Sequence, residues 1–183
     1  IYLGPLYYYL ISVPYFIAQF DPLRFYLISA LIGAATTYFI YKVGSTIFER
    51  TSIGIIASLI FAVSYFSNSY GRLLTGLTLA PILSLLVYLF LYQNLKFKKP
   101  KNLLLLGFVL LVVSQNEGSS FSLILLAVAA FVIWRFKVPA WKAIQIIILF
   151  VVFHIPLLIF DLRHNFFITK SFGSFIRKGD VAH

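Results

Sequence analysis

Long apolar stretches alternate with short polar loops along the whole chain. The period within the stretches is helical or uniformly apolar, and no strand-like alternation of apolar and polar positions occurs. Because an apolar helix of about 20 residues crosses a bilayer, the pattern predicts an all-α fold, a polytopic transmembrane helix bundle of about six spans behind a shorter first helix. The apolar segments are 6–20, 23–41, 51–66, 77–92, 103–113, 121–136 and 140–160.

The first apolar segment, 6–20, is short for a span. Pro5 opens it, at a position where a missing N–H costs no helical hydrogen bond. About 15 residues rise only ~23 Å as a helix, and Pro14 removes the backbone bond to Leu10. We therefore expect a juxtamembrane or re-entrant helix that is interrupted at Pro14.

A polar turn at 114–120 follows the segment 103–113 and carries Glu117. That segment rises only ~17 Å, whereas the bilayer core is ~30 Å thick. The turn is then expected within the membrane, where non-helical backbone is buried in protein or lines a wet cavity, and an intramembrane carboxylate is a candidate functional group. The alternative is a slightly longer helix whose turn reaches the interface.

Composition agrees with an integral membrane protein. Apolar residues make up 61% of the chain and charged residues 11%, against about 45–50% and 25% in soluble domains. The net charge of +10 resides in short loops between apolar spans, so it reports membrane orientation and predicts no nucleic-acid partner. The chain has no cysteine, which excludes a disulfide framework, a thiol nucleophile and a thiolate metal site.

Basic residues are concentrated in alternate loops, which predicts the orientation. By the positive-inside rule the richer set is cytoplasmic, and the loops with Arg24, Arg72 and Glu117 then face outward with the tail after Asp161. The richer set is Lys42, Arg50, Lys96, Lys98, Lys99, Lys101, Arg135, Lys137 and Lys142.

We expect one transmembrane domain over 1–183, since no linker, low-complexity tract or repeat divides the chain. Its parts are a juxtamembrane or re-entrant segment at 1–20, a bundle at 21–160 and an outer interfacial segment at 161–183. The chain starts without Met, so we interpret it as a fragment of a longer membrane protein. The sequence upstream of Ile1 would be the most informative addition.

Several short motifs together resemble glycosyltransferases of the GT-C fold, of the protein mannosyltransferase or family 39 kind. Gly-Pro-Leu-Tyr-Tyr-Tyr-Leu at 4–10 resembles the end of that family's His-Pro-Pro-Leu-Tyr-Tyr motif. The other stretches, in the family's order, are 24–30, 41–48, Ser-Tyr-Gly-Arg at 69–72, and Pro-Leu-Leu-Ile-Phe-Asp-Leu-Arg-His-Asn-Phe at 156–166. The chain departs from the family pattern after Arg72, where many members have a carboxylate and residues 73–76 have none. The resemblance therefore does not identify the acceptor.

The resemblance implies transfer of a hexose from a polyprenyl-phosphate donor to a glycan, lipid or protein acceptor on the extracytoplasmic face. The expected location is a prokaryotic cytoplasmic membrane. In the family an acidic residue of the first outer loop is the general base, and we expect it upstream of Ile1. No cofactor is firmly implied, and a divalent metal ion stays open.

The candidate donor-phosphate ligands are Arg72 and Arg24, because a guanidinium matches phosphate oxygens and both residues lie at the expected outer interface. The alternative for both is snorkelling from helix ends. Glycosyl transfer also needs polar groups around an acceptor hydroxyl. We assign these to the acceptor or cavity: Glu117, Gln115, Asn116, Tyr7 and Tyr8. Interfacial anchoring alone also explains the tyrosines.

The tail after Asp161 alternates aromatic and basic residues, which predicts an interfacial amphipathic segment that contains Arg163 and His164. His154 lies before Pro156, and we expect it to bond backbone freed by that proline rather than to act in catalysis. A transporter or flippase of a lipid-linked or anionic substrate is the alternative function. It would show inverted repeats of broken helices, and no matching pair occurs in this sequence.

Overall fold

The structure is a computed structural model and describes residues 5–19, 21–65, 67, 69, 76–97, 102–116, 121–167, 169, 170 and 173. The described residues form helices without strands, so the all-α membrane bundle is confirmed. The helices are α1 (Pro5–Ala18), α2 (Pro22–Phe48), α3 (Thr51–Val63), α5 (Gly76–Phe97), α6 (Leu103–Asn116), α7 (Phe121–Ile133) and α8 (Ala140–Arg163).

Helix α2 shows how local sequence sets the helix ends. Asp21 precedes it and accepts a hydrogen bond from the Leu23 amide at 2.9 Å, while Pro22 occupies the first helical position. At the other end Glu49 adopts a left-handed conformation, with φ of 55°, and terminates the helix. At this end α2 extends seven residues beyond the predicted segment 23–41, through Lys42 and Ser45.

Three described helices, α2, α5 and α8, are long and apolar enough to cross a membrane by length and composition. The other four have 13 or 14 residues, which rise only about 20 Å against a ~30 Å hydrocarbon core. The number of spans therefore stays a prediction. Helix α1 continues through Pro14, so the expected interruption there is wrong: a proline inside a helix removes one hydrogen bond without ending it.

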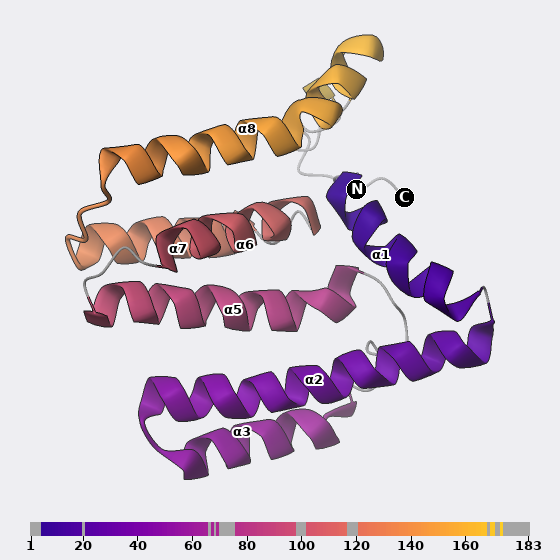
Figure 1. Cartoon of the computed structure of the whole chain (residues 1–183), viewed down its shortest axis with the longest axis vertical. Coiled ribbons are helices and arrows are strands. Elements are labelled where there is room, and N and C mark those ends of the chain that lie inside the picture. Colours follow the sequence, from indigo (N-terminus) through magenta and orange to yellow (C-terminus); the bar gives the residue numbers. More distant parts are fainter. Residues whose placement is uncertain are drawn as a thin grey trace.

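Six helices run roughly side by side, and α1 lies obliquely at one end of them (Figure 1). We name this end, where α2 and α5 begin and α6 and α8 finish, the α1 end. The opposite end is the basic end. Helix α1 contacts α2, α6 and α8, and Tyr15 stacks on Phe25 of α2 with ring centroids 4.6 Å apart. The juxtamembrane or re-entrant location of this helix stays a prediction.

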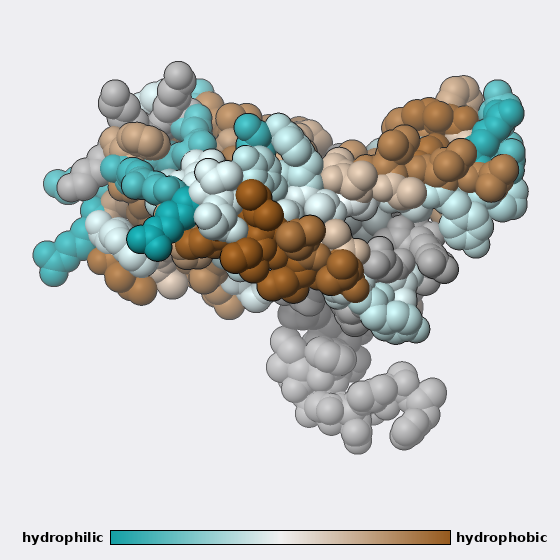
Figure 2. Space-filling view, turned by 90° about the horizontal axis from the view of Figure 1, so that it is seen from below, coloured by the Kyte–Doolittle hydropathy of each residue, from teal (hydrophilic) through white to brown (hydrophobic). Residues whose placement is uncertain are grey.

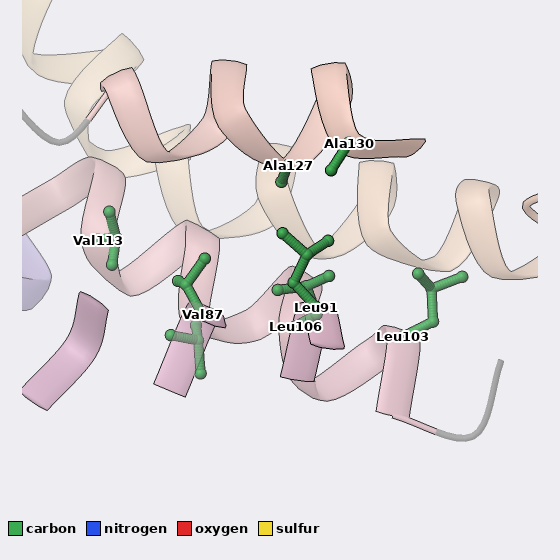
Figure 3. Close-up of a cluster of buried hydrophobic side chains, with 8 residues drawn as sticks. Val87, Leu91, Leu103, Leu106, Val113, Ala127 and Ala130 are labelled. Atoms are coloured by element: carbon green, nitrogen blue, oxygen red, sulfur yellow. The ribbon is translucent and has the colours of Figure 1, made fainter. Parts of the chain in front are cut away.

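The buried core lies between α5, α6 and α7, where small and branched side chains interlock (Figure 3). Helix α6 is the central element, and Leu103, Leu106 and Val113 along it are at most 2% exposed. In lipid such packing stabilises through van der Waals contact rather than through a hydrophobic driving force. The other core residues are Val87, Leu91, Val109, Ala127 and Ala130.

The outward surfaces of the helices are apolar, as expected of a protein that faces lipid. Figure 2 shows hydrophilic side chains gathered where α2 passes into α3 and hydrophobic surface along the helices. On α3 the exposed side chains include Ile55, Ile56, Leu59, Ile60 and Val63. A contiguous apolar surface of this extent is typical of a membrane protein.

Candidate functional site

The polar residues that follow the apolar part of α6 lie in the helix rather than in a turn. Ser114, Gln115 and Asn116 form its last turn, so the prediction of a turn beginning at Ser114 is wrong. The helix continues for one more turn, within which the Ser114 hydroxyl donates to the Leu111 carbonyl at 2.7 Å and is satisfied without leaving the helix. Glu117 lies outside the described residues.

Gln115 and Asn116 are buried, at 3% and 1% exposure. The Gln115 amide nitrogen donates to the Phe153 carbonyl of α8 at 3.0 Å. This polar contact joins the end of α6 to the middle of α8 inside the apolar bundle. The structure therefore brings two of the predicted cavity residues to a protected position at the α1 end, beside the helix that carries Tyr7 and Tyr8.

Pro156 lies in α8 close to the carbonyl that Gln115 contacts. A proline in a helix has no N–H for the carbonyl four residues earlier and its ring crowds that turn, so the backbone of α8 is loosened at this point. Helix interruptions in membranes persist when a neighbouring helix satisfies the backbone. The carbonyl that Pro156 leaves without its N–H is that of Val152, and the Gln115 bond from α6 is made to the next carbonyl, that of Phe153.

His154 is partly buried and its ring is bonded within α8. Its Nδ1 lies 2.8 Å from the Phe150 carbonyl, and the ring stacks on Phe150 with centroids 4.2 Å apart. Since the carbonyl that Pro156 leaves without its N–H is that of Val152, the predicted partner is wrong in detail. The short imidazole side chain reaches instead the carbonyl of Phe150, which lies one helical turn before His154 itself.

Arg24 has local partners at the α1 end. Its guanidinium donates to the Gln19 side chain at 2.8 Å and lies 3.4 Å from the Asp21 carboxylate, and the Arg24 side chain is 55% exposed. This pairing offsets its charge next to the N-terminus of α2. Arg72 lies outside the described residues, as does the loop around it.

Of the two tyrosines predicted to line the cavity, the structure describes the side chain of Tyr8 and not that of Tyr7. Tyr8 is 57% exposed on α1, which is compatible with both an interfacial anchor and an open site. Tyr7 belongs to the same helix, and its side chain lies outside the described part. Arg163 ends α8 and His164 caps it, and both are exposed.

Each of the three carboxylates that the structure describes already has a partner. Asp21 caps α2 and pairs with Arg24. Glu49 pairs with Lys96, whose hydrogen bond holds the pKa of the Glu49 carboxyl below its usual value. Asp161, 9% exposed, accepts hydrogen bonds from Thr169. Sequence reasoning missed the pairing of Asp161, although Asn165 just beyond the helix was a signal for a turn there.

A metal site is not apparent in the part of the chain that the structure describes. No group of three or more His, Asp or Glu side chains there is arranged to hold an ion. The acidic and imidazole groups among the described residues are dispersed over several helices and are hydrogen-bonded to protein.

One of three comparisons with known proteins identifies a family for the chain. Residues 3–160 match the family described as dolichyl-phosphate-mannose-protein mannosyltransferase. The chain belongs to this family. It is thus a membrane glycosyltransferase chain of the GT-C type, as the resemblance of the ordered motifs predicted. No curated protein and no solved structure matches it.

Proposed function

We propose that the protein transfers a hexose from a polyprenyl-phosphate donor to an acceptor on the extracytoplasmic face of the membrane. The observation that carries this proposal is the family match over 3–160, joined to the buried polar groups at the α1 end. A donor of this kind keeps its isoprenoid chain in lipid and its phosphate at the interface. Apolar outward surfaces with polar groups at one end suit that division.

The positions of Gln115 and Asn116 support an acceptor or sugar site at the α1 end. Their amides are protected from bulk solvent, and amides of this kind can both donate to and accept from sugar hydroxyls. Glu117 directly follows them in the sequence, so its carboxylate belongs to the same proposed site.

The general base is proposed to come from a segment outside the described residues. Asp21, Glu49 and Asp161 are engaged in capping, an ion pair and a side-chain hydrogen bond. A base must be within hydrogen-bond reach of the acceptor hydroxyl and free to take its proton. These three carboxylates are committed to structure, which supports a base from elsewhere in the protein.

Arg72 is the proposed ligand of the donor phosphate. A charge-assisted bond is worth roughly 1.5–3 kcal/mol, so Arg72→Ala should weaken donor use by about ten- to a hundredfold, with Arg72→Lys intermediate because a lysine lacks the planar fork. The measurement is steady-state transfer from dolichyl-phosphate mannose, the donor in the family's description.

Arg135→Ala is the matched control, since Arg135 is an exposed arginine at the basic end, and its donor kinetics should equal those of the parent protein. Parent-like donor kinetics in Arg72→Ala at normal protein level would leave only the snorkelling explanation. No transfer from any polyprenyl-phosphate sugar by the full-length parent protein would overturn the proposed function itself.

A further inference from the structure

The chain reverses sharply where α8 ends, and the reversal contains unusual backbone. Asn165 and Phe166 both have positive φ, 55° and 59°. Asparagine accepts this conformation readily, whereas a bulky phenylalanine adopts it only where its surroundings enforce it. The Phe166 amide donates to the Asp161 carbonyl at 2.8 Å, which is the closing bond of a Schellman turn.

Asp161 closes this corner with its side chain as well. Its carboxylate accepts from the hydroxyl and, at 3.4 Å, from the backbone amide of Thr169, eight residues later. The Lys170 amide donates to the Phe166 carbonyl at 2.9 Å, so helical structure resumes beyond the turn. Through these bonds we infer that Asp161 is a positioning residue for the direction in which the chain leaves α8.

The corner presents an apolar and basic surface. Phe166 and Phe167 are 50% and 47% exposed, and Leu162 is 61% exposed. Arg163 and Lys170 are exposed beside them. The apolar part is continuous with the exposed face of α8 below it, through Ile155, Leu158 and Ile159.

We propose that this corner, formed by the described residues 161–167, 169 and 170, docks on the anionic phospholipid headgroups of the bilayer into which α8 is inserted. The only acid in it, Asp161, is turned inward to Thr169, so the outward charge is positive and complements phosphate. Exposed aromatic rings beside basic side chains are the combination that inserts shallowly at a membrane surface. Helix α8 is long and apolar enough to cross a membrane, so the corner at its end is expected at the depth of the headgroups.

The test uses a single cysteine at Phe167 in the full-length protein, labelled with the environment-sensitive dye NBD. The described chain contributes no other cysteine. The protein is reconstituted in vesicles of phosphatidylcholine, with and without phosphatidylglycerol. We expect blue-shifted emission, quenched by headgroup spin labels, that strengthens with phosphatidylglycerol. This readout is independent of sugar transfer.

Two double variants distinguish the effect of the basic residues at the corner from the effect of the protein's net charge. Each basic side chain near an anionic surface contributes about fivefold to surface binding, so Arg163→Gln with Lys170→Gln should abolish the response to phosphatidylglycerol. Arg135→Gln with Lys137→Gln removes the same charge from an exposed loop at the basic end and should leave the response intact. Equal loss in both pairs would overturn the proposal.

The Asp161 contact is tested separately by hydrogen exchange of the amides at 164–170. Thr169→Val should speed exchange and weaken the blue shift, whereas Thr169→Ser retains the hydroxyl and should restore both. Unchanged exchange in Thr169→Val overturns the positioning role. Water-like emission in all vesicles, or a blue shift seen only in native membranes, overturns lipid docking, and the second result assigns the corner to a protein partner.

Discussion

Gln115 shows how a side chain can be hydrogen-bonded by a residue that is distant in the sequence. Its amide donates to the Phe153 carbonyl of α8, 38 positions away. A glutamine inside a lipid-facing bundle would be unfavourable alone, because its polar groups would lose water without replacement. Here the same bond satisfies the glutamine and joins two helices at the candidate site.

At the residue scale, Gln115→Leu should destabilise the protein by about 0.6–1.7 kcal/mol, the range measured for hydrogen bonds between helices in membranes. The substitution keeps the volume and removes the donor to Phe153. The measurement is thermal or denaturant unfolding in detergent. Ser84→Ala is the control, since it removes a 2.8 Å bond to Ala80 within one helix, and we expect a smaller effect. An equal effect in both would contradict a specific interhelical bond.

Helices α2 and α3 approach each other closely, and glycine makes this approach possible. A Cβ at Gly54 would lie 2.5 Å from the Tyr41 carbonyl oxygen and 2.2 Å from the Ser45 hydroxyl. Backbone on one side leaves no room for adjustment. Small residues at helix contacts in membranes allow such close approach.

At the element scale, Gly54→Ala should cost about 1–3 kcal/mol in unfolding free energy, the range for overpacking. Gly107→Ala should cost less, because its nearest neighbour is the flexible side chain of Ile146, at 2.8 Å. Gly33→Ala meets nothing within 4 Å and should be neutral or stabilising by up to about 1 kcal/mol through helix propensity. The order of the three variants in detergent unfolding tests the packing, and a parent-like Gly54→Ala would contradict it.

Two helix ends are joined by the ion pair between Glu49, after α2, and Lys96, in the last turn of α5. Because the hydrogen bond from Lys96 lowers the pKa of Glu49 in the folded state, the stabilisation is present above the unfolded pKa and is lost as pH falls through the folded pKa. The pair is exposed, so the effect is small and sensitive to salt.

We therefore expect Glu49→Gln to lower the melting temperature slightly at neutral pH and to converge with the parent protein below about pH 4.5, the ordinary pKa of the group. Lys96→Met should show the same convergence. Melting curves in detergent at low salt between neutral and acidic pH provide the measurement. A difference that persists unchanged at acidic pH would assign the effect to packing.

At the scale of the whole molecule, the structure collects loops from distant parts of the sequence at two opposite ends. The ion pair between Glu49 and Lys96 shows that the end of α2 and the end of α5 lie next to each other. Helix α8 connects the loop with Lys137 to the corner with Lys170. The orientation of these ends relative to the cell follows from loop charge and stays a prediction.

In intact cells an impermeant maleimide should label a cysteine at Lys170 and spare one at Lys137, because the richer basic set is expected on the cytoplasmic side. Both substituted positions are exposed, and detergent permeabilisation should allow both to react. The reverse pattern would invert the orientation and, with it, the face on which sugar transfer is proposed.

The sequence by itself determined the membrane class, the approximate helix segments and the family. These follow from local properties: apolar length, proline and capping residues, and motifs in order. It placed Gln115 and Asn116 among candidate site residues before their burial was visible. The positions of helix ends were harder to predict from the sequence, and α6, which continues to Asn116, is an example. The final turn of a helix depends on side-chain bonds that several conformations allow.

Only the tertiary structure decided which polar groups meet. The partners Gln115 and Phe153, Glu49 and Lys96, and Asp161 and Thr169 are separated by 38, 47 and 8 positions. No local pattern specifies such a pair, because a polar side chain in an apolar bundle is satisfied by whichever group the packing brings within reach. Helix packing selected those groups, and thereby distinguished carboxylates committed to structure from residues that remain candidates for chemistry.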